Sequence, residues 1–132
     1  MIGILDYGLG NLHSVKNALN FLGAESKIIS DSSEIEQSQS IIIPGVGSFQ
    51  KAMKKLNQKN MIKPIIEFAK TEKPILGICL GMQLLATTGY EPEQTEGLGL
   101  IPGEVKLMNP SLRLPHVGWN GIDIKKSSKL FV

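Results

Sequence analysis

Cysteine is almost absent from this chain, which has one, Cys79, in 132 residues. A single cysteine cannot form an internal disulfide, and residues 1–5 show no basic segment or cleavage site of a signal peptide, so we expect a cytoplasmic protein. An excess of charge of one sign is also lacking, because 14 basic residues face 12 acidic ones and neither kind forms a block. We therefore expect no nucleic-acid partner. No apolar run approaches the roughly twenty residues that cross a bilayer, and we expect no membrane partner.

Aromatic residues are few, at 5%, whereas 42% of the chain is apolar and 20% is charged. These proportions are ordinary for a globular protein, and the length allows one substantial core, so we predict a single domain over residues 1–132. No group of cysteine, histidine and acidic residues has metal-ligand spacing. We expect neither a metal nor an organic cofactor.

Short apolar runs alternate with amphipathic ones, the pattern of a mostly parallel sheet with helices on its faces. We predict strands at residues 2–5, 26–30, 41–43 and 74–78, of which the first and the last are buried. Helical spacing or a capping residue predicts helices over residues 12–22, after Ser48, after Pro64 and over residues 82–87. Two further strands are expected at residues 104–108 and 121–124. The predicted fold is an α/β sandwich of three layers.

Three loops at predicted strand ends have a composition suited to chemistry: residues 6–11, 44–47 and 77–83. Such loops converge at the carboxyl edge of a parallel sheet. The first lacks a complete Gly-x-Gly-x-x-Gly and is a weak dinucleotide site. The two glycines of residues 44–47 let the main chain approach a ligand, and its amides, with that of Leu80, could hold a developing oxyanion. A structural turn without a ligand is an equally good interpretation of that loop alone.

Cys79 lies at the centre of a Gly-x-Cys-x-Gly segment between two apolar runs. A sharp turn from strand to helix that exposes a nucleophile needs small flanking residues, and a helix N-terminus favours a thiolate. The alternative is a buried cysteine that acts as a small hydrophobic residue. The glycine frame favours the nucleophile.

Four segments in order, residues 6–12, 44–49, 77–83 and 115–120, together resemble the triad-type, or class I, glutamine amidotransferases. The Asp-Tyr-Gly opening and the Pro-His-x-Gly-Trp-Asn segment favour, within them, the amidotransferase subunits of imidazole glycerol phosphate synthase in histidine biosynthesis. The resemblance implies a flavodoxin-like class I amidotransferase fold.

By this resemblance Cys79 attacks the side-chain amide of glutamine, ammonia leaves, and the thioester is hydrolysed to glutamate. Gly47 and Leu80 would supply oxyanion amides, and Gln83 and Glu91 match positions that contact glutamine in the family. The ammonia would pass to a partner synthase subunit with a β/α barrel fold.

The family's general base is a histidine and its orienting acid a glutamate, both beyond the Trp-Asn segment. The two histidines of this chain, His13 and His116, do not match that base: we expect the first to be an exposed or capping residue and the second a structural or interface residue. Residues 129–132 end inside an apolar run, so we expect a C-terminally truncated chain that turns over poorly alone. Two alternatives stay open: an amidotransferase subunit for surface-sugar amidation, and a scaffold domain without catalysis.

Overall fold

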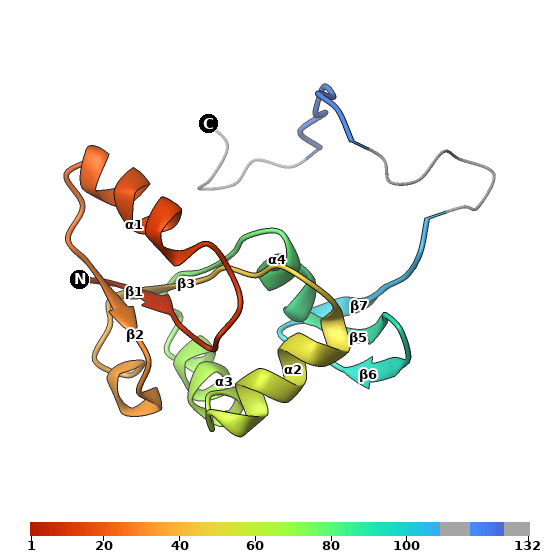
Figure 1. Ribbon diagram of the computed structural model, residues 1–132, viewed down its shortest axis with the longest axis horizontal. Coiled ribbons are helices and arrows are strands. Elements are labelled where there is room, and N and C mark those ends of the chain that lie inside the picture. The colour runs from red at the N-terminus through yellow and green to blue at the C-terminus, as the bar shows by residue number, and fades with distance from the viewer. Residues whose placement is uncertain (109–116, 126–132) are drawn as a thin grey trace.

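A four-stranded parallel sheet forms the centre of the molecule (Figure 1). The computed structural model describes residues 1–108 and 117–125. The strands are β1 (Ile2–Leu5), β2 (Ser26–Ile29), β3 (Ser40–Ile43) and β4 (Ile75–Gly77), in the order β2-β1-β3-β4. The chain therefore reverses its direction of winding between β1 and β3, so that the loops after these two strands meet at the carboxyl edge of the sheet.

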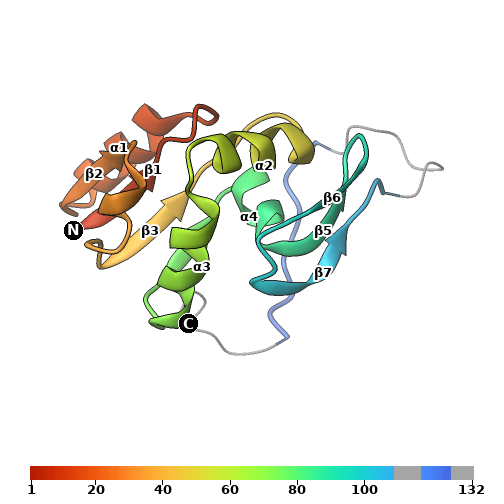
Figure 2. The ribbon, with the colours of Figure 1, turned by 90° about the horizontal axis from the view of Figure 1, so that it is seen from below.

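Helices lie on both faces of this sheet, with α1 (Leu12–Phe21) on one side and α2 (Phe49–Gln58) and α3 (Ile62–Lys70) on the other (Figures 1 and 2). The side chain of Asn11 caps α1 by accepting from the Ser14 amide, and Gly23 ends it with φ +70°. A short 3₁₀ helix, η1 (Ser32–Glu34), is capped by Asp31. In the part of the chain that is described, no helix has the length and apolar content of a membrane span. The predicted three-layer α/β sandwich is confirmed.

The main hydrophobic core lies between the sheet and the layer of α2 and α3. Alternate residues of the strands point into it, as the period of two requires. Its buried side chains include Leu5, Ile29, Ile41, Ile43, Phe49, Leu56, Ile65 and Phe68. This burial is the main stabilising contribution that fixes the sheet.

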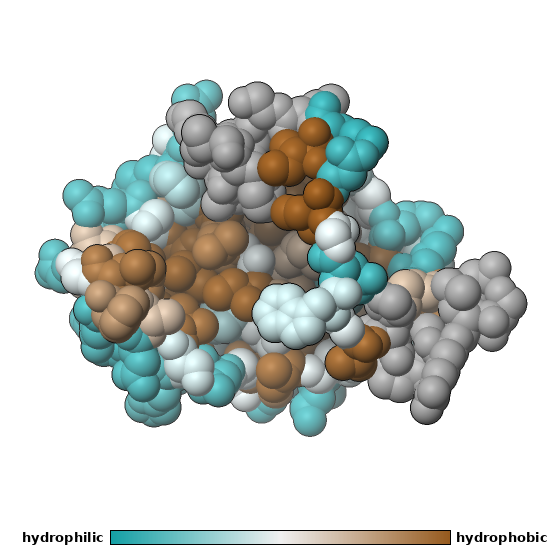
Figure 3. Space-filling view, turned by 90° about the horizontal axis from the view of Figure 1, so that it is seen from above, coloured by the Kyte–Doolittle hydropathy of each residue, from teal (hydrophilic) through white to brown (hydrophobic). Residues whose placement is uncertain are grey.

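Among the described residues, α1 covers the opposite face of the sheet over β1 and β2 only and leaves the other half uncovered. Strand register puts Ile4, Ile42 and Leu76 in one row across this face. Their exposed fractions rise along the row, 0%, 6% and 40%. Figure 3 looks onto this face and shows a broad hydrophobic area around a hollow. The expectation of a fully buried fourth strand is therefore wrong, since β4 is partly exposed.

A second, three-stranded sheet follows the helix α4 (Leu80–Leu84). Its strands are β5 (Ala86–Tyr90), β6 (Gln94–Glu96) and β7 (Ile101–Val105), in the order β6-β5-β7. The β5–β6 pair is antiparallel and the β5–β7 pair parallel. The ring of Phe49 packs directly on β5, since a Cβ on Gly89 would lie 2.4 Å from that ring.

Three predictions about this region are wrong. The helix expected over residues 82–87 ends at Leu84, because amides of the following loop bond to its last carbonyls: Leu98 to Leu84 and Ile101 to Leu85, both at 2.8 Å. The strand expected at residues 104–108 is shifted to Ile101–Val105, where it pairs with β5. Residues 121–124 form no strand.

Candidate functional site

Cys79 occupies the sharp turn between the end of β4 at Gly77 and the start of α4 at Leu80. Its backbone has φ +55° and ψ −117°, and the residue is exposed. Positive φ is costly for a residue with a side chain, on the order of 1–3 kcal/mol. Asn60 and Glu72 also have positive φ, but both follow the C-terminal ends of helices, where such residues are common. Cys79 instead precedes a helix, the conformation that presents a nucleophile outward.

The glycines on either side of Cys79 permit this turn by direct contact with other backbone. A Cβ on Gly77 would lie 2.5 Å from the Cα of Met82, and one on Gly81 would lie 1.7 Å from the carbonyl oxygen of Ile43. Neither position has room for a side chain. The structure therefore has the sharp turn from strand to helix at Cys79 that the flanking glycines predict.

The loop of residues 44–47 lies against the start of α4. The Ile78 amide donates to the Ile43 carbonyl at 3.0 Å, which joins the ends of β3 and β4. A Cβ on Gly45 would lie 3.0 Å from both the Gly81 nitrogen and the Leu80 Cβ. Two residues later Gly47 is exposed, with φ +105°. The loop and the nucleophile are thus held together by backbone packing at glycines.

Two backbone amides of this region are available as donors: that of Leu80, next to Cys79, and that of Gly47, in the loop that packs on the start of α4. Within residues 1–108 and 117–125, the N–H groups of Gly47 and Leu80 make no hydrogen bond. Leu80 opens α4, so its amide has no partner within the helix. Free backbone donors beside a nucleophile are the elements of an oxyanion site.

The loop of residues 6–11 packs on the other side of residues 44–47. A Cβ on Gly10 would lie 3.2 Å from the Pro44 Cβ and 3.3 Å from the Gly45 nitrogen. The buried hydroxyl of Tyr7 donates to the Pro44 carbonyl at 2.6 Å. The three loops selected from the sequence therefore do converge at one edge of the sheet. Tyr7 was not among the site residues expected; its only sequence signal was its place in the Asp-Tyr-Gly segment at a strand end.

Charge and burial distinguish Tyr7 from an ordinary tyrosine. Burial and, to a smaller extent, the negative charge of an ionised Cys79 raise the pKa of the Tyr7 hydroxyl to about 12. The hydroxyl therefore stays protonated, and a donor, at neutral pH.

Gln83 and Glu91 approach this edge from different elements. Gln83 lies one turn after Cys79 on α4 and is half-buried. Its backbone N–H donates to the Cys79 carbonyl at 3.3 Å. Glu91 is exposed in the turn between β5 and β6. Its backbone carbonyl accepts from the backbone N–H of Gln50 at 3.1 Å. Gln50 is the second residue of α2, three residues after Gly47. Glu91 is thus tied to the helix that the 44–47 loop enters.

His13 is exposed on α1, as expected, and His116 lies outside the described residues. Trp119 is fully exposed and packs against none of the described residues.

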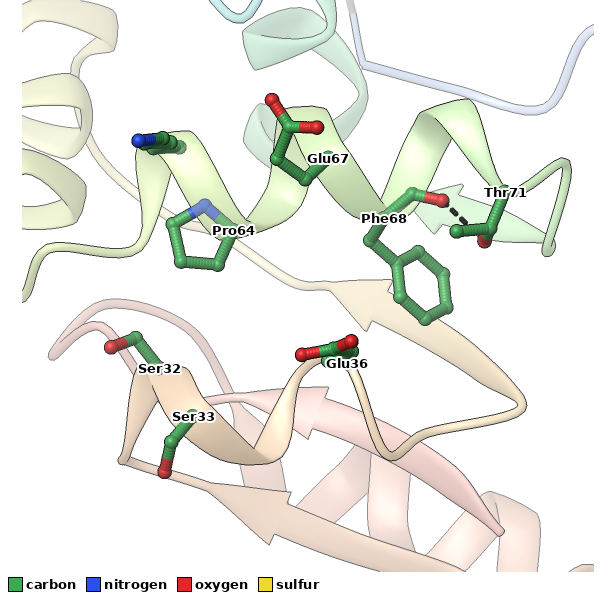
Figure 4. A pocket seen from close by; sticks show the side chains of 8 residues that line it. Ser32, Ser33, Glu36, Pro64, Glu67, Phe68 and Thr71 are labelled. Atoms are coloured by element: carbon green, nitrogen blue, oxygen red, sulfur yellow. Dashed lines mark hydrogen bonds between the residues drawn. The ribbon is translucent and has the colours of Figure 1, made fainter.

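A separate groove lies between η1 and α3, with a cavity of about 490 Å³ (Figure 4). Its walls carry hydroxyl, charged and aromatic side chains: Ser32, Ser33, Glu36, Lys63, Pro64, Glu67, Phe68 and Thr71. Two of its polar groups already have partners, since Lys70 contacts the Glu67 carboxylate and the Thr71 hydroxyl donates to the Phe68 carbonyl. None of the three converging loops lines it, so Cys79 is the centre of the candidate site.

The family model named Glutamine amidotransferase class-I matches residues 3–120 of this chain. The chain belongs to this family. The exposed Cys79 and its strained turn lie within the matched residues.

Two curated relatives of this chain carry the same name. The "Imidazole glycerol phosphate synthase subunit HisH" of Listeria monocytogenes serotype 4a (strain HCC23) is 48% identical over 132 residues, which are 98% of this chain and 64% of that protein. The protein of the same name from Bacillus cereus (strain G9842) is 48% identical over 120 residues, 91% of this chain and 57% of that protein. The amidotransferase chain thus spans less than two thirds of the length of these relatives.

Solved structures support the fold. One titled "Crystal structure of glutamine amidotransferase" matches 78% of this chain and 54% of its own, with a TM-score of 0.67 and 22% identity. A "Putative Peptidase E Protein" from Listeria monocytogenes EGD-e matches 66% of this chain and 50% of its own, with a TM-score of 0.56 and 14% identity. At such identities these likenesses establish the class I amidotransferase fold and nothing further.

Proposed function

We propose that this chain is the nucleophile-bearing part of the amidotransferase subunit of imidazole glycerol phosphate synthase, which releases ammonia from glutamine for histidine biosynthesis. The observation that carries the proposal is the strained, exposed Cys79, with a free amide at Leu80 and a second at Gly47, in the loop that packs on the start of α4. Identities of 48% to relatives of that name support the choice of synthase. Surface-sugar amidation has no comparable support.

In the proposed reaction the Cys79 thiolate attacks the side-chain carbonyl carbon of glutamine. The carbonyl oxygen becomes an oxyanion, which the amides of Gly47 and Leu80 stabilise. The C–N bond then breaks, the nitrogen takes a proton and leaves as ammonia, and a thioester remains on Cys79. Water attacks the thioester, giving glutamate and regenerating the thiol. We assign binding of glutamine to Gln83 and Glu91, which lie at the same edge of the sheet.

Proton transfer requires a general base, and neither histidine of residues 1–132, His13 or His116, corresponds to the histidine that acts as base in the family. The family resemblance puts this histidine and its glutamate beyond the Trp-Asn segment. We propose that both groups act on Cys79 in the whole subunit, which works in the cytoplasm as a heterodimer with a β/α barrel synthase. We propose further that the partner consumes the ammonia and that the complex as a whole is a lyase.

The test is covalent labelling of the subunit, co-expressed with its synthase partner, by 6-diazo-5-oxo-norleucine, a reactive glutamine mimic. We expect one adduct, mapped by peptide fragmentation to Cys79, and protection by excess glutamine. The Cys79→Ser variant is the control and should remain unlabelled. A wild-type complex that gains no adduct would contradict a glutamine site at Cys79 and would favour a scaffold role. The same conclusion would follow if excess glutamine did not slow formation of the adduct.

A further inference from the structure

Among the described residues, Tyr7 is the one side chain that donates a hydrogen bond to the loop expected to hold the oxyanion. It follows β1 and is completely buried, and its hydroxyl donates to the carbonyl oxygen of Pro44 at 2.6 Å. Within the described residues this is the only hydrogen bond that residues 44–47 make. The loop therefore depends on a single polar contact for its position.

The same hydroxyl also contacts the segment that packs on the nucleophile. A Cβ on Gly45 would lie 2.5 Å from the Tyr7 oxygen and 3.0 Å from the Gly81 nitrogen. Tyr7, the Gly45 backbone and the start of α4 thus form a continuous stack that ends beside Cys79.

We propose that Tyr7 is a positioning residue, whose hydroxyl holds the Pro44 carbonyl so that residues 44–47 present the Gly47 amide to the oxyanion. This inference rests on the proposed glutaminase function. The alternative is that Tyr7 only fills the core where β1 ends. The two readings differ in what the hydroxyl does, because the ring alone is enough to fill space.

A raised pKa suits the positioning role. Because the pKa of Tyr7 is about 12, the hydroxyl remains a donor to Pro44 through the pH range in which the enzyme would work. It is not poised to exchange protons with substrate.

The test compares Tyr7→Phe with Tyr90→Phe in the full-length subunit bound to its synthase partner. Phenylalanine keeps the ring of Tyr7 and removes only the donor to Pro44. Tyr90 is the matched control, since its exposed hydroxyl also makes one hydrogen bond, to Glu104 at 3.0 Å, on the second sheet. We expect Tyr7→Phe to lower kcat for glutamine about 10- to 100-fold with KM within about twofold, because an oxyanion donor acts mainly in the transition state. Tyr90→Phe should change neither.

A second readout does not depend on catalysis. In spectra of the ¹⁵N-glycine-labelled complex, Tyr7→Phe should shift or broaden the Gly45 and Gly47 resonances, and Tyr90→Phe should not. The rate of Cys79 alkylation by iodoacetamide, which needs no oxyanion site, should stay within about twofold of wild type.

The outcomes separate the two proposals. An active wild-type complex with Tyr7→Phe kinetics equal to those of Tyr90→Phe overturns the positioning role and leaves the glutaminase intact. The positioning role is also overturned, in favour of a packing role, if Tyr7→Phe lowers kcat and the rate of Cys79 alkylation by the same factor and unfolds at a much lower temperature than wild type. A wild-type complex without glutaminase activity overturns the proposed function, and with it the role of Tyr7 in catalysis, even where the glycine resonances shift.

Discussion

Replacement of Gly81 by alanine tests whether backbone packing assembles the site. Gly81 is the second residue of α4, two residues after the nucleophile. Its added Cβ would lie 1.7 Å from the carbonyl oxygen of Ile43, whereas carbon atoms of this kind do not approach within 3.0 Å. The obstacle is main chain rather than the end of a flexible side chain. The start of α4 must therefore move by about 1.3 Å away from β3.

This displacement has a calculable cost. Overpacking of a filled site costs about 1–3 kcal/mol. The movement also strains the bond from the Ile78 amide to the Ile43 carbonyl, at 3.0 Å, worth about 1 kcal/mol. We expect Gly81→Ala to lower the free energy of unfolding by about 3 kcal/mol, which corresponds to a fall of roughly 10 °C in Tm for a chain of this size.

The assay is urea unfolding of the chain, followed by tyrosine and tryptophan fluorescence, with Gly121→Ala as the control. A Cβ on Gly121 meets nothing within 4 Å, so this variant should stay within about 0.5 kcal/mol of wild type. In the assembled enzyme, Gly81→Ala should also lower kcat by about 100-fold, since a shift near 1 Å misplaces the Leu80 amide. If Gly81→Ala unfolds at the same urea concentration as Gly121→Ala, α4 does not pack on the Ile43 carbonyl and the derivation of the site is wrong.

Three further predictions concern strain, titration and burial. Cys79→Gly should be about 1 kcal/mol more stable than Cys79→Ala in urea unfolding, because glycine accepts φ +55° without penalty; equal stabilities would contradict the strained turn. The pKa of Tyr7 is raised from 10.0 to about 12, so its contribution to stability is fully present below pH 10 and is lost as pH rises through 12; the stability advantage of wild type over Tyr7→Phe should shrink across that window, and a constant difference would argue against a buried neutral hydroxyl. Ile4→Ala should cost about 3 kcal/mol and Leu76→Ala less than half of that, since their exposed fractions are 0% and 40%; equal costs in thermal unfolding would mean that β4 is covered as well as β1.

The central sheet could be predicted from the sequence because each of its strands is a short apolar run closed by glycine, proline or a polar turn. Residues 41–43 are an example: three isoleucines before a Pro-Gly pair leave little choice but a buried strand, and β3 has them. The same holds for Cys79, since glycines two positions away on both sides are explained by the close backbone contacts that the structure contains. For β3 and for the turn at Cys79, the neighbouring residues in the sequence are therefore enough to predict the structure.

The second sheet could not be predicted, because its strands depend on partners distant in the chain. Residues 86–90 are small and polar, and they are held as β5 by pairing with residues 94–96 and 101–105. The helix before them stops at Leu84 because its last carbonyls are taken by amides from residues 98–101. Residues 121–124 show the converse error: Ile122 and Ile124 alternate as in a strand, yet both are exposed. Alternation favours a strand only where a neighbouring strand is present.

The site itself lies between these two cases. Each loop could be selected from its own composition, but not the contacts that join them: Tyr7 to Pro44, Gly45 to Leu80 and Gly81 to Ile43. Two of these three contacts occur at glycines, where the missing side chain leaves space for another segment of backbone. A glycine in a strand-end loop is therefore evidence of a close neighbour as well as of a turn. Tyr7 is the exception, since its hydrogen bond gives no signal of this kind in the sequence. A contact made by one hydroxyl can be lost by a single substitution without disturbing the fold, which is why its effect on the site has to be measured through the position of the loop as well as through stability.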